Sequence, residues 1–280
     1  MRNTVSAEWT KLLPHKGTWL LVWIYPILFA LVLTIGLIGE PGMSKDAAKA
    51  AGWIEETTMV WQISAFTLGR YLIAAYIALV FAGEYGWNTL KLVVPHTARW
   101  KLTASKYVVA LGLLYVAWTA AAAMTVAAEI TKTWMAGLSV PEGVTFATVL
   151  SGHAAAFANG VVPLLLTAAY ASVMAVLTRS TLAAFIVSLV LITLDELLGK
   201  LVMALSSFGM EWLAVPYRVL PSYHLENFAS WTQAGKAYVL PLASGATVQM
   251  SQLTSTLAIG TWIVGLIAVT FWWFRRQDIN

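Results

Sequence analysis

The sequence contains no cysteine, and only 11% of its 280 residues are charged. The absence of cysteine excludes disulfides and thiolate metal sites, although it does not identify a compartment. A soluble domain carries about 25% charged residues, so this low charge, together with 59% hydrophobic residues, predicts an integral membrane protein. The net charge of +4 does not indicate nucleic-acid binding, because most basic residues stand at the ends of apolar runs, where they orient membrane proteins.

Motifs of enzymes and nucleotide-binding proteins are also missing. The sequence has no phosphate loop of the Gly-x4-Gly-Lys-Ser/Thr form, and neither the Gly-Xaa-Ser-Xaa-Gly nor the His-Glu-Xaa-Xaa-His pattern occurs. No two of the four histidines stand at metal-ligand spacing. We therefore expect no catalytic residue, metal or cofactor in this chain. A membrane enzyme that uses Glu55 or Glu56 remains a rival class.

Long apolar runs predict an all-α membrane domain that occupies residues 1–280 and crosses the membrane six times. Each run is long enough to cross about 30 Å of hydrocarbon. Residues 1–17 are expected to form an interfacial helix, residues 39–58 a solvated loop, and the aromatic, proline-containing residues 206–254 re-entrant segments on the outer side. The spans are expected at residues 18–38, 59–81, 107–130, 153–177, 182–205 and 255–274.

The basic residues near the span ends predict the orientation. Six spans place both termini on one side, and this side also collects most of the lysines and arginines. They are Arg2, Lys11, Lys16, Lys91, Arg99, Lys101, Lys106, Arg179, Arg275 and Arg276. We therefore expect a multi-pass protein of the cytoplasmic membrane with both termini in the cytoplasm.

Arg70 lies at the centre of the second predicted span. A charge at that depth costs at least about 2.5–3.5 kcal/mol, so Arg70 is expected to face the bundle interior and to find a carboxylate partner. The candidates are Asp195, Glu196 and Glu129. Arg70 either belongs to a substrate pathway or gate, or forms a structural ion pair. Lys200 is an alternative partner for the first two carboxylates.

Residues 84–106 form a polar, basic island between two apolar runs. Within this island, apolar residues recur at steps of three and four, as on one face of a short helix. They are Trp87, Leu90, Val93 and Val94. A short amphipathic helix between two spans suits docking in a partner's groove, so we expect such a helix over residues 84–98. The alternative is a plain cytoplasmic turn with basic anchors.

Three stretches, taken in order, resemble the permease subunits of bacterial ABC-2 type transporters. Residues 7–12 (Ala-Glu-Trp-Thr-Lys-Leu) look like the N-terminal connecting helix of that family, and residues 84–106 look like its cytoplasmic loop. Residues 274–279 (Phe-Arg-Arg-Gln-Asp-Ile) look like its C-terminal end. The layout covers the whole chain. One departure is that Trp87 and Asn88 separate Gly86 from Thr89, where the family often has Gly-Thr.

The resemblance implies a permease without its own ATP site that exports a hydrophobic or amphipathic substrate, such as a drug, antimicrobial peptide or lipid. Two copies of an ABC ATP-binding subunit would hold the ATP and magnesium, and a second permease copy or a related permease would complete the transporter. The ATPase-docking residues would be Glu84, Trp87, Thr89, Leu90, Val93, Val94 and Arg99. The alternative is a stand-alone channel or ion-coupled secondary transporter that uses Arg70 and Asp195. That class predicts inverted repeats, which the sequence does not show.

Overall fold

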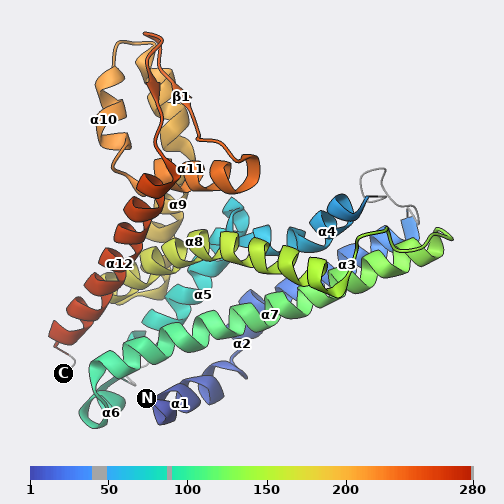
Figure 1. Ribbon diagram of the computed structural model, residues 1–280. Coiled ribbons are helices and arrows are strands. Elements are labelled where there is room, and N and C mark those ends of the chain that lie inside the picture. The colour runs from blue at the N-terminus through green and yellow to red at the C-terminus, as the bar shows by residue number, and fades with distance from the viewer. Residues whose placement is uncertain (40–48, 87–89, 279–280) are drawn as a thin grey trace. The chain divides into compact units, whose positions relative to one another are not determined.

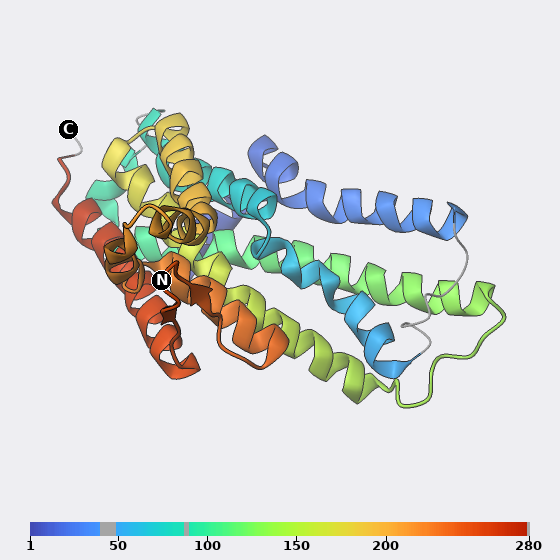
Figure 2. The ribbon, with the colours of Figure 1, turned by 90° about the horizontal axis from the view of Figure 1, so that it is seen from above.

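The computed structural model describes residues 1–39, 49–86 and 90–278, and these residues are mostly helical (Figures 1 and 2). Six helical stretches in this described part are long and apolar enough to cross a membrane. They are Lys16–Gly39, Thr67–Gly86, Arg99–Met135, Phe146–Thr178, Thr181–Ser206 and Gln252–Arg276. The protein is therefore a mostly helical membrane protein with six candidate spans, which is the coarse architecture that the sequence predicts.

The chain divides into two compact units, each of which is described by itself. Unit 1 comprises Met1–Phe66 and Lys101–Gly160, and unit 2 comprises Thr67–Trp100 and Val161–Asn280. Two long helices contribute to both units: α7 (Arg99–Met135) lies mainly in unit 1, and α8 (Phe146–Thr178) changes unit after Gly160.

Unit 1 contains the N-terminal elements and most of α7. Besides α7 and the first part of α8 it holds a π-helical turn at Trp19–Trp23, a 3-10 helix at Met59–Ser64, α1 (Arg2–Leu12), α2 (Lys16–Thr18), α3 (Ile24–Gly39) and α4 (Ala50–Thr58). In α1 the buried side chains are Glu8 and Leu12, whereas Trp9 and Leu13 are exposed. Glu8 forms ion pairs with Lys11 at 2.6 Å and with Lys106 of α7 at 3.9 Å. The N-terminal helix is thus tied to α7 through a buried charge.

The structure corrects the predicted boundaries around residues 50–66. Residues 50–58 form α4 rather than a solvated loop, and Met59–Ser64 form a 3-10 helix, so the long helix α5 begins only at Thr67. The reason is tertiary. The indole of Trp61 donates to His153 Nδ1 at 3.0 Å, and the carbonyl of Val60 accepts from the Tyr25 hydroxyl at 2.7 Å. These contacts hold the 3-10 helix in unit 1, with Val60, Trp61 and Ser64 buried. The other candidate spans extend a few residues beyond the predicted limits.

Unit 2 contains three more candidate spans and the segments that connect them. Its elements are α5 (Thr67–Gly86), α6 (Leu90–Val93), the second part of α8, α9 (Thr181–Ser206), α10 (Ala214–Tyr217), α11 (Pro221–Ala234), β1 (Leu240–Pro241), β2 (Thr247–Val248), α12 (Gln252–Arg276) and 3-10 helices at Val94–His96 and Glu211–Leu213. Helix α5 packs along α9, and α11 packs against both α9 and α12. In Figure 1, α10, α11 and the strands gather where α9 ends and α12 begins.

The connection between α9 and α12, residues 207–251, has its own small core. Strand β1 pairs antiparallel with β2, with Leu240 opposite Val248. The buried side chains of this core are Val202, Ala214, Tyr217, Tyr223, Leu240 and Val248. Pro221 opens α11, and Gly235 ends it with a left-handed φ of 65°, which are the preferred residues at those two positions. These two residues set the limits of α11, the helix that carries polar side chains packed against α9 and α12.

Candidate functional site

Arg70 of α5 and Asp195 of α9 form a buried ion pair in unit 2. The Arg70 Nη2 atom lies 2.6 Å from Asp195 Oδ2, and the exposed fractions of the two residues are 1% and 5%. Both residues stand within candidate membrane spans. Because α5 begins only at Thr67, Arg70 lies in the first turn of its helix and not at the centre of the span, where the sequence predicts it. The sequence offers three carboxylates as partners for Arg70, and the structure pairs it with Asp195.

Side chains from two further helices form hydrogen bonds with this ion pair. Arg70 Nε donates to Thr167 Oγ1 at 3.0 Å. Asp195 Oδ1 accepts from the Tyr170 hydroxyl at 3.2 Å and from Ser222 Oγ at 3.4 Å. Thr167 and Tyr170 belong to α8, and Ser222 belongs to α11. The pair therefore joins α5, α8, α9 and α11 at one point, which we call the Arg70 centre.

Two further polar contacts connect α5 and α9 beside the Arg70 centre. The Thr67 hydroxyl donates to the carboxylate of Glu196. The hydroxyls of Tyr71 and Thr193 lie 2.6 Å apart. Thr67, Arg70 and Tyr71 follow the i, i+3, i+4 spacing of one helix face, so this face of α5 carries the polar contacts to α9.

The physical chemistry of the Arg70 centre depends on its burial. Removing two charges from water is costly, and their attraction offsets the cost only when further hydrogen bonds satisfy the remaining groups. The hydroxyls of Thr167, Tyr170 and Ser222 supply such bonds. An arrangement of this kind can hold four elements in register. It can also respond to protonation or to a charged ligand, because loss of either charge leaves the other uncompensated.

The structure separates the remaining predicted membrane charges from this pair. Glu196 bonds to Thr67, as described above. Glu129 lies in unit 1, where its partner is Lys132, three residues further along α7. Lys200, the alternative partner of Asp195 and Glu196, is exposed and pairs with neither among the described residues.

The predicted docking segment is described only in part. Trp87 and Thr89 lie outside the described residues, as does the side chain of Val93. Helix α6 covers Leu90–Val93, and the 3-10 helix that follows begins at Val94. Leu90 is only 3% exposed, so its side chain packs within this chain. The exposed positions of the segment include Lys91, Pro95 and His96.

Arg99, which the sequence assigns to ATPase docking, binds the end of α12. Its Nη1 atom donates to the carbonyl oxygens of Phe274 at 3.1 Å, Arg275 at 2.9 Å and Gln277 at 2.6 Å. The last carbonyls of a helix lack intrahelical partners and carry partial negative charge, so a cation stabilises them. Glu84 lies in the last turn of α5, before the loop, whereas Arg99 is the first residue of α7, after the loop.

Gln277 is a residue that the sequence gives no reason to select. Its amide oxygen accepts from the Tyr85 hydroxyl of α5 at 2.5 Å, and its amide nitrogen donates to the Val176 carbonyl of α8. It is only 5% exposed. Sequence reasoning does not select Thr167 or Ser222 either, because each is one of many isolated hydroxyl residues in the chain. The polar hydroxyl of Tyr170, deep in an apolar run, is the one available signal.

Comparison with known proteins does not assign the chain to a family. No protein-family model matches it, and no curated protein matches it. The functional interpretation therefore depends on the residues and contacts described above.

Proposed function

We propose that the chain is the membrane-spanning permease subunit of an ATP-binding cassette exporter. It would move a hydrophobic or amphipathic substrate, such as a drug, antimicrobial peptide or lipid, across the cytoplasmic membrane. Two copies of a separate ATPase subunit bind ATP and magnesium, and a second permease, identical or related, completes the transporter. Both termini and the loop after α5 face the cytoplasm in this proposal.

The observation that carries the proposal is a short helical segment in the loop between two candidate spans. Helix α6 and its 3-10 continuation occupy Leu90–His96, between the end of α5 at Gly86 and the start of α7 at Arg99. A short helix of this kind suits a groove on a partner. The chain also has no phosphate loop, so a transporter driven by ATP requires such a partner.

The contacts of α5 supply a route from this loop to the rest of unit 2. Arg70 lies sixteen residues before Gly86, which is about 24 Å along the helix. A displacement of the loop moves α5, and the Arg70 centre connects α5 to α8, α9 and α11. Each nucleotide state of the ATPase must bind one arrangement of these helices better than the other for ATP to drive transport.

Co-purification tests the proposal. The tagged chain, extracted from its native cells in mild detergent, should bring down a protein that contains a phosphate loop. Trp87→Asp and Lys91→Glu should each reduce the recovery of that protein, whereas Lys236→Glu, a charge change at an exposed position outside this loop, should not. Unchanged recovery from both loop variants, with normal gel-filtration profiles, would remove the docking assignment.

The buried Arg70–Asp195 pair favours a second candidate, a stand-alone channel or ion-coupled transporter, because ionisable pairs in membrane helices often mark ion pathways. Liposomes that contain only this chain distinguish the two. Transport driven by an ion gradient without ATPase, and abolished by Asp195→Asn, would establish the second candidate. An ATP requirement supplied by the co-purified ATPase would establish the first.

A further inference from the structure

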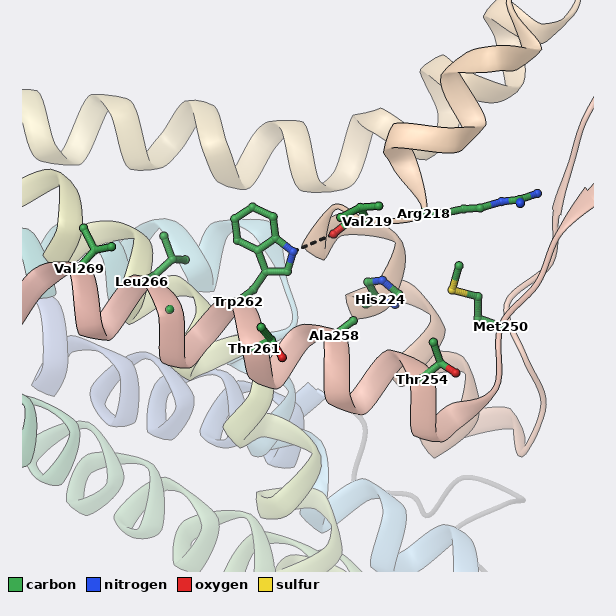
Figure 3. A pocket seen from close by; sticks show the side chains of 11 residues that line it. Arg218, Val219, His224, Met250, Thr254, Ala258, Thr261, Trp262, Leu266 and Val269 are labelled. Carbon is green, nitrogen blue, oxygen red and sulfur yellow. Dashed lines mark hydrogen bonds between the residues drawn. The ribbon is translucent and has the colours of Figure 1, made fainter.

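A groove with a volume of about 660 Å³ runs along α12 in unit 2 (Figure 3). One end of the groove carries polar groups from Arg218, His224 and Thr254, and the other end is formed by Leu266 and Val269. The middle is lined by Ala258, Thr261, Trp262 and Gly265. The groove is therefore amphipathic along its length, with its polar end where α12 begins.

Hydrogen bonds fix the walls of the groove. The Trp262 indole donates to the carbonyl oxygen of Val219 at 2.8 Å, so it holds the loop between α10 and α11 against α12. His224 Nδ1 lies 3.0 Å from Ser255 Oγ, which joins α11 to the first turn of α12. Asn227 donates to the same hydroxyl at 2.7 Å. Three side-chain hydrogen bonds therefore hold the shape of the groove, two between α11 and α12 and one between α12 and the loop at Val219.

The length of the groove matches a lipid chain. Ala258 and Val269, at the two ends of the groove's stretch beyond the polar end, are eleven residues apart, which is about 16 Å along a helix. One leaflet of a bilayer has a hydrocarbon thickness of about 15 Å, half of the full core. Because α12 is a candidate span, the surroundings of its exposed face are acyl chains. Small residues at Ala258 and Gly265 leave room for such a chain to lie against the helix.

The charge of the groove selects the headgroup. Arg218 is exposed at the polar end, and none of the lining residues is acidic. Among the described residues, no carboxylate forms an ion pair with Arg218. A guanidinium group binds phosphate oxygens through two parallel hydrogen bonds. The occupant that satisfies both ends carries a negative phosphate headgroup and an aliphatic chain.

We propose that this groove binds an anionic phospholipid of the surrounding membrane, with one acyl chain along α12 and its phosphate on Arg218. The proposal concerns a resident lipid and does not depend on the exporter assignment. By bridging α12 and the loop at Val219, the lipid would stabilise the α9–α12 connection against α12. Membranes that contain anionic lipid should therefore stabilise the α9–α12 connection more than membranes that lack it.

Photo-crosslinking tests the proposal on the full-length chain in nanodiscs. One arm uses photoreactive phosphatidylglycerol, and the other uses photoreactive phosphatidylcholine with the same chain. We expect phosphatidylglycerol to label peptides within residues 254–269. Arg218→Gln should reduce this labelling about tenfold, the factor expected for one charge-assisted hydrogen bond. Arg218→Lys should retain part of it, and phosphatidylcholine labelling should be low throughout.

Two glycines of α12 provide a matched test of the chain site. A Cβ at Gly265 or at Gly260 meets no atom within 4 Å, so both positions have open space beside the backbone. Gly265 lines the groove and Gly260 does not. Gly265→Leu should occupy the groove and abolish phosphatidylglycerol labelling of residues 254–269, while Gly260→Leu leaves it unchanged.

Three results would overturn the proposal. The first is equal labelling by the two lipids, and the second is equal labelling of the two leucine variants. The third is an absence of labelling together with crosslinks between two copies through a cysteine placed at Thr261, which would show that a second chain covers the groove. Gel filtration and melting profiles of every variant exclude misfolding as the cause of a loss.

Discussion

Two buried carboxylates, Asp195 in unit 2 and Glu129 in unit 1, differ in where their partners come from. Their exposed fractions are similar, at 5% and 3%. The cation that pairs with Asp195 is 125 positions away on another helix, whereas the cation that pairs with Glu129 is Lys132 on the same helix. Lys132 is also partly exposed. Burial of a charge therefore does not by itself show that its ion pair joins two helices, because the cation can come from the same helix.

The largest effect is expected from Arg70→Gln. This change leaves Asp195 charged and buried without its cation, which costs about 3–5 kcal/mol. For a chain of this size we expect the melting temperature in detergent to fall by roughly 10 °C. A fluorescence melting curve of the purified protein measures the effect.

The double variant Arg70→Gln/Asp195→Asn is the control for this prediction. It replaces the ion pair with two neutral, hydrogen-bonding side chains of similar size, so it should recover most of the lost stability. If both the single and the double variant melted like the wild type, the Arg70 centre would not hold the four elements together.

Two glycines extend the comparison between the units. A Cβ at Gly160 in unit 1 would lie 2.8 Å from the backbone oxygen of Trp61, and a Cβ at Gly199 in unit 2 would lie 2.6 Å from the Tyr217 hydroxyl. Each change to alanine should destabilise the protein by about 1–3 kcal/mol, the usual cost of overpacking. Thermal melting of the two alanine variants measures it.

Only the Gly199 clash can be relieved by a second substitution. The Tyr217 hydroxyl is buried without a hydrogen-bond partner among the described residues, so Tyr217→Phe should cost little by itself. Combined with Gly199→Ala, it should restore the wild-type melting temperature. The Trp61 carbonyl belongs to the backbone, so no side-chain substitution at Trp61 should restore the melting temperature of Gly160→Ala. This packing would be contradicted if a substitution at Trp61 restored the melting temperature of Gly160→Ala as fully as Tyr217→Phe restores that of Gly199→Ala.

A smaller effect is expected from pH, through His224 of α11. Burial lowers the pKa of His224 below its usual 6.5, so the folded state favours the neutral ring. The unfolded chain then binds more protons, and stability that is present above about pH 6.5 is lost as the pH falls through the lowered pKa. Melting curves between pH 8 and pH 5 should show this loss, and His224→Gln should reduce it. A pH dependence that persists in the variant would assign it to another group.

The smallest effect is expected from Glu129→Gln. The Glu129–Lys132 ion pair lies within one helix, and Glu129 also contacts Glu56 of α4, which is itself an acid. A neutral glutamine can still form a hydrogen bond with Glu56, so we expect little net loss of stability. We expect the melting temperature to change by no more than about 2 °C. A loss as large as that of Arg70→Gln would mean that Glu129 has tertiary partners of equal importance, and the contrast between the two units would disappear.

The coarse fold follows from the sequence, because six apolar runs long enough to span a membrane have few alternatives to helices. The need of Arg70 for a partner follows from the cost of an isolated charge in the membrane. The choice of Asp195 does not follow, since it depends on how α5 and α9 are rotated about their axes. Neighbouring Glu196 is equally acidic but bonds to Thr67 instead.

The boundaries around residues 50–66 could not be predicted from local pattern. Residues 59–66 are mostly apolar and run into the next span, so hydropathy joins them to it. The 3-10 helix ends at Ser64, whose hydroxyl donates to the Gly160 carbonyl at 2.8 Å, a contact between residues 96 positions apart that no local pattern records. The docking segment illustrates the same limit, since the apolar spacing that selects Leu90 does not distinguish a partner's groove from this chain's own interior.

The contacts of Gln277 have a consequence for handling the protein. Its amide side chain binds α5 and α8, and its own carbonyl oxygen binds Arg99 of α7. A variant that ends after Gln277 should keep these helix ends joined, whereas one that ends after Arg276 should release α5 and α8, with Arg99 still bound to Phe274 and Arg275. A truncation intended to help crystallisation should therefore not pass residue 277.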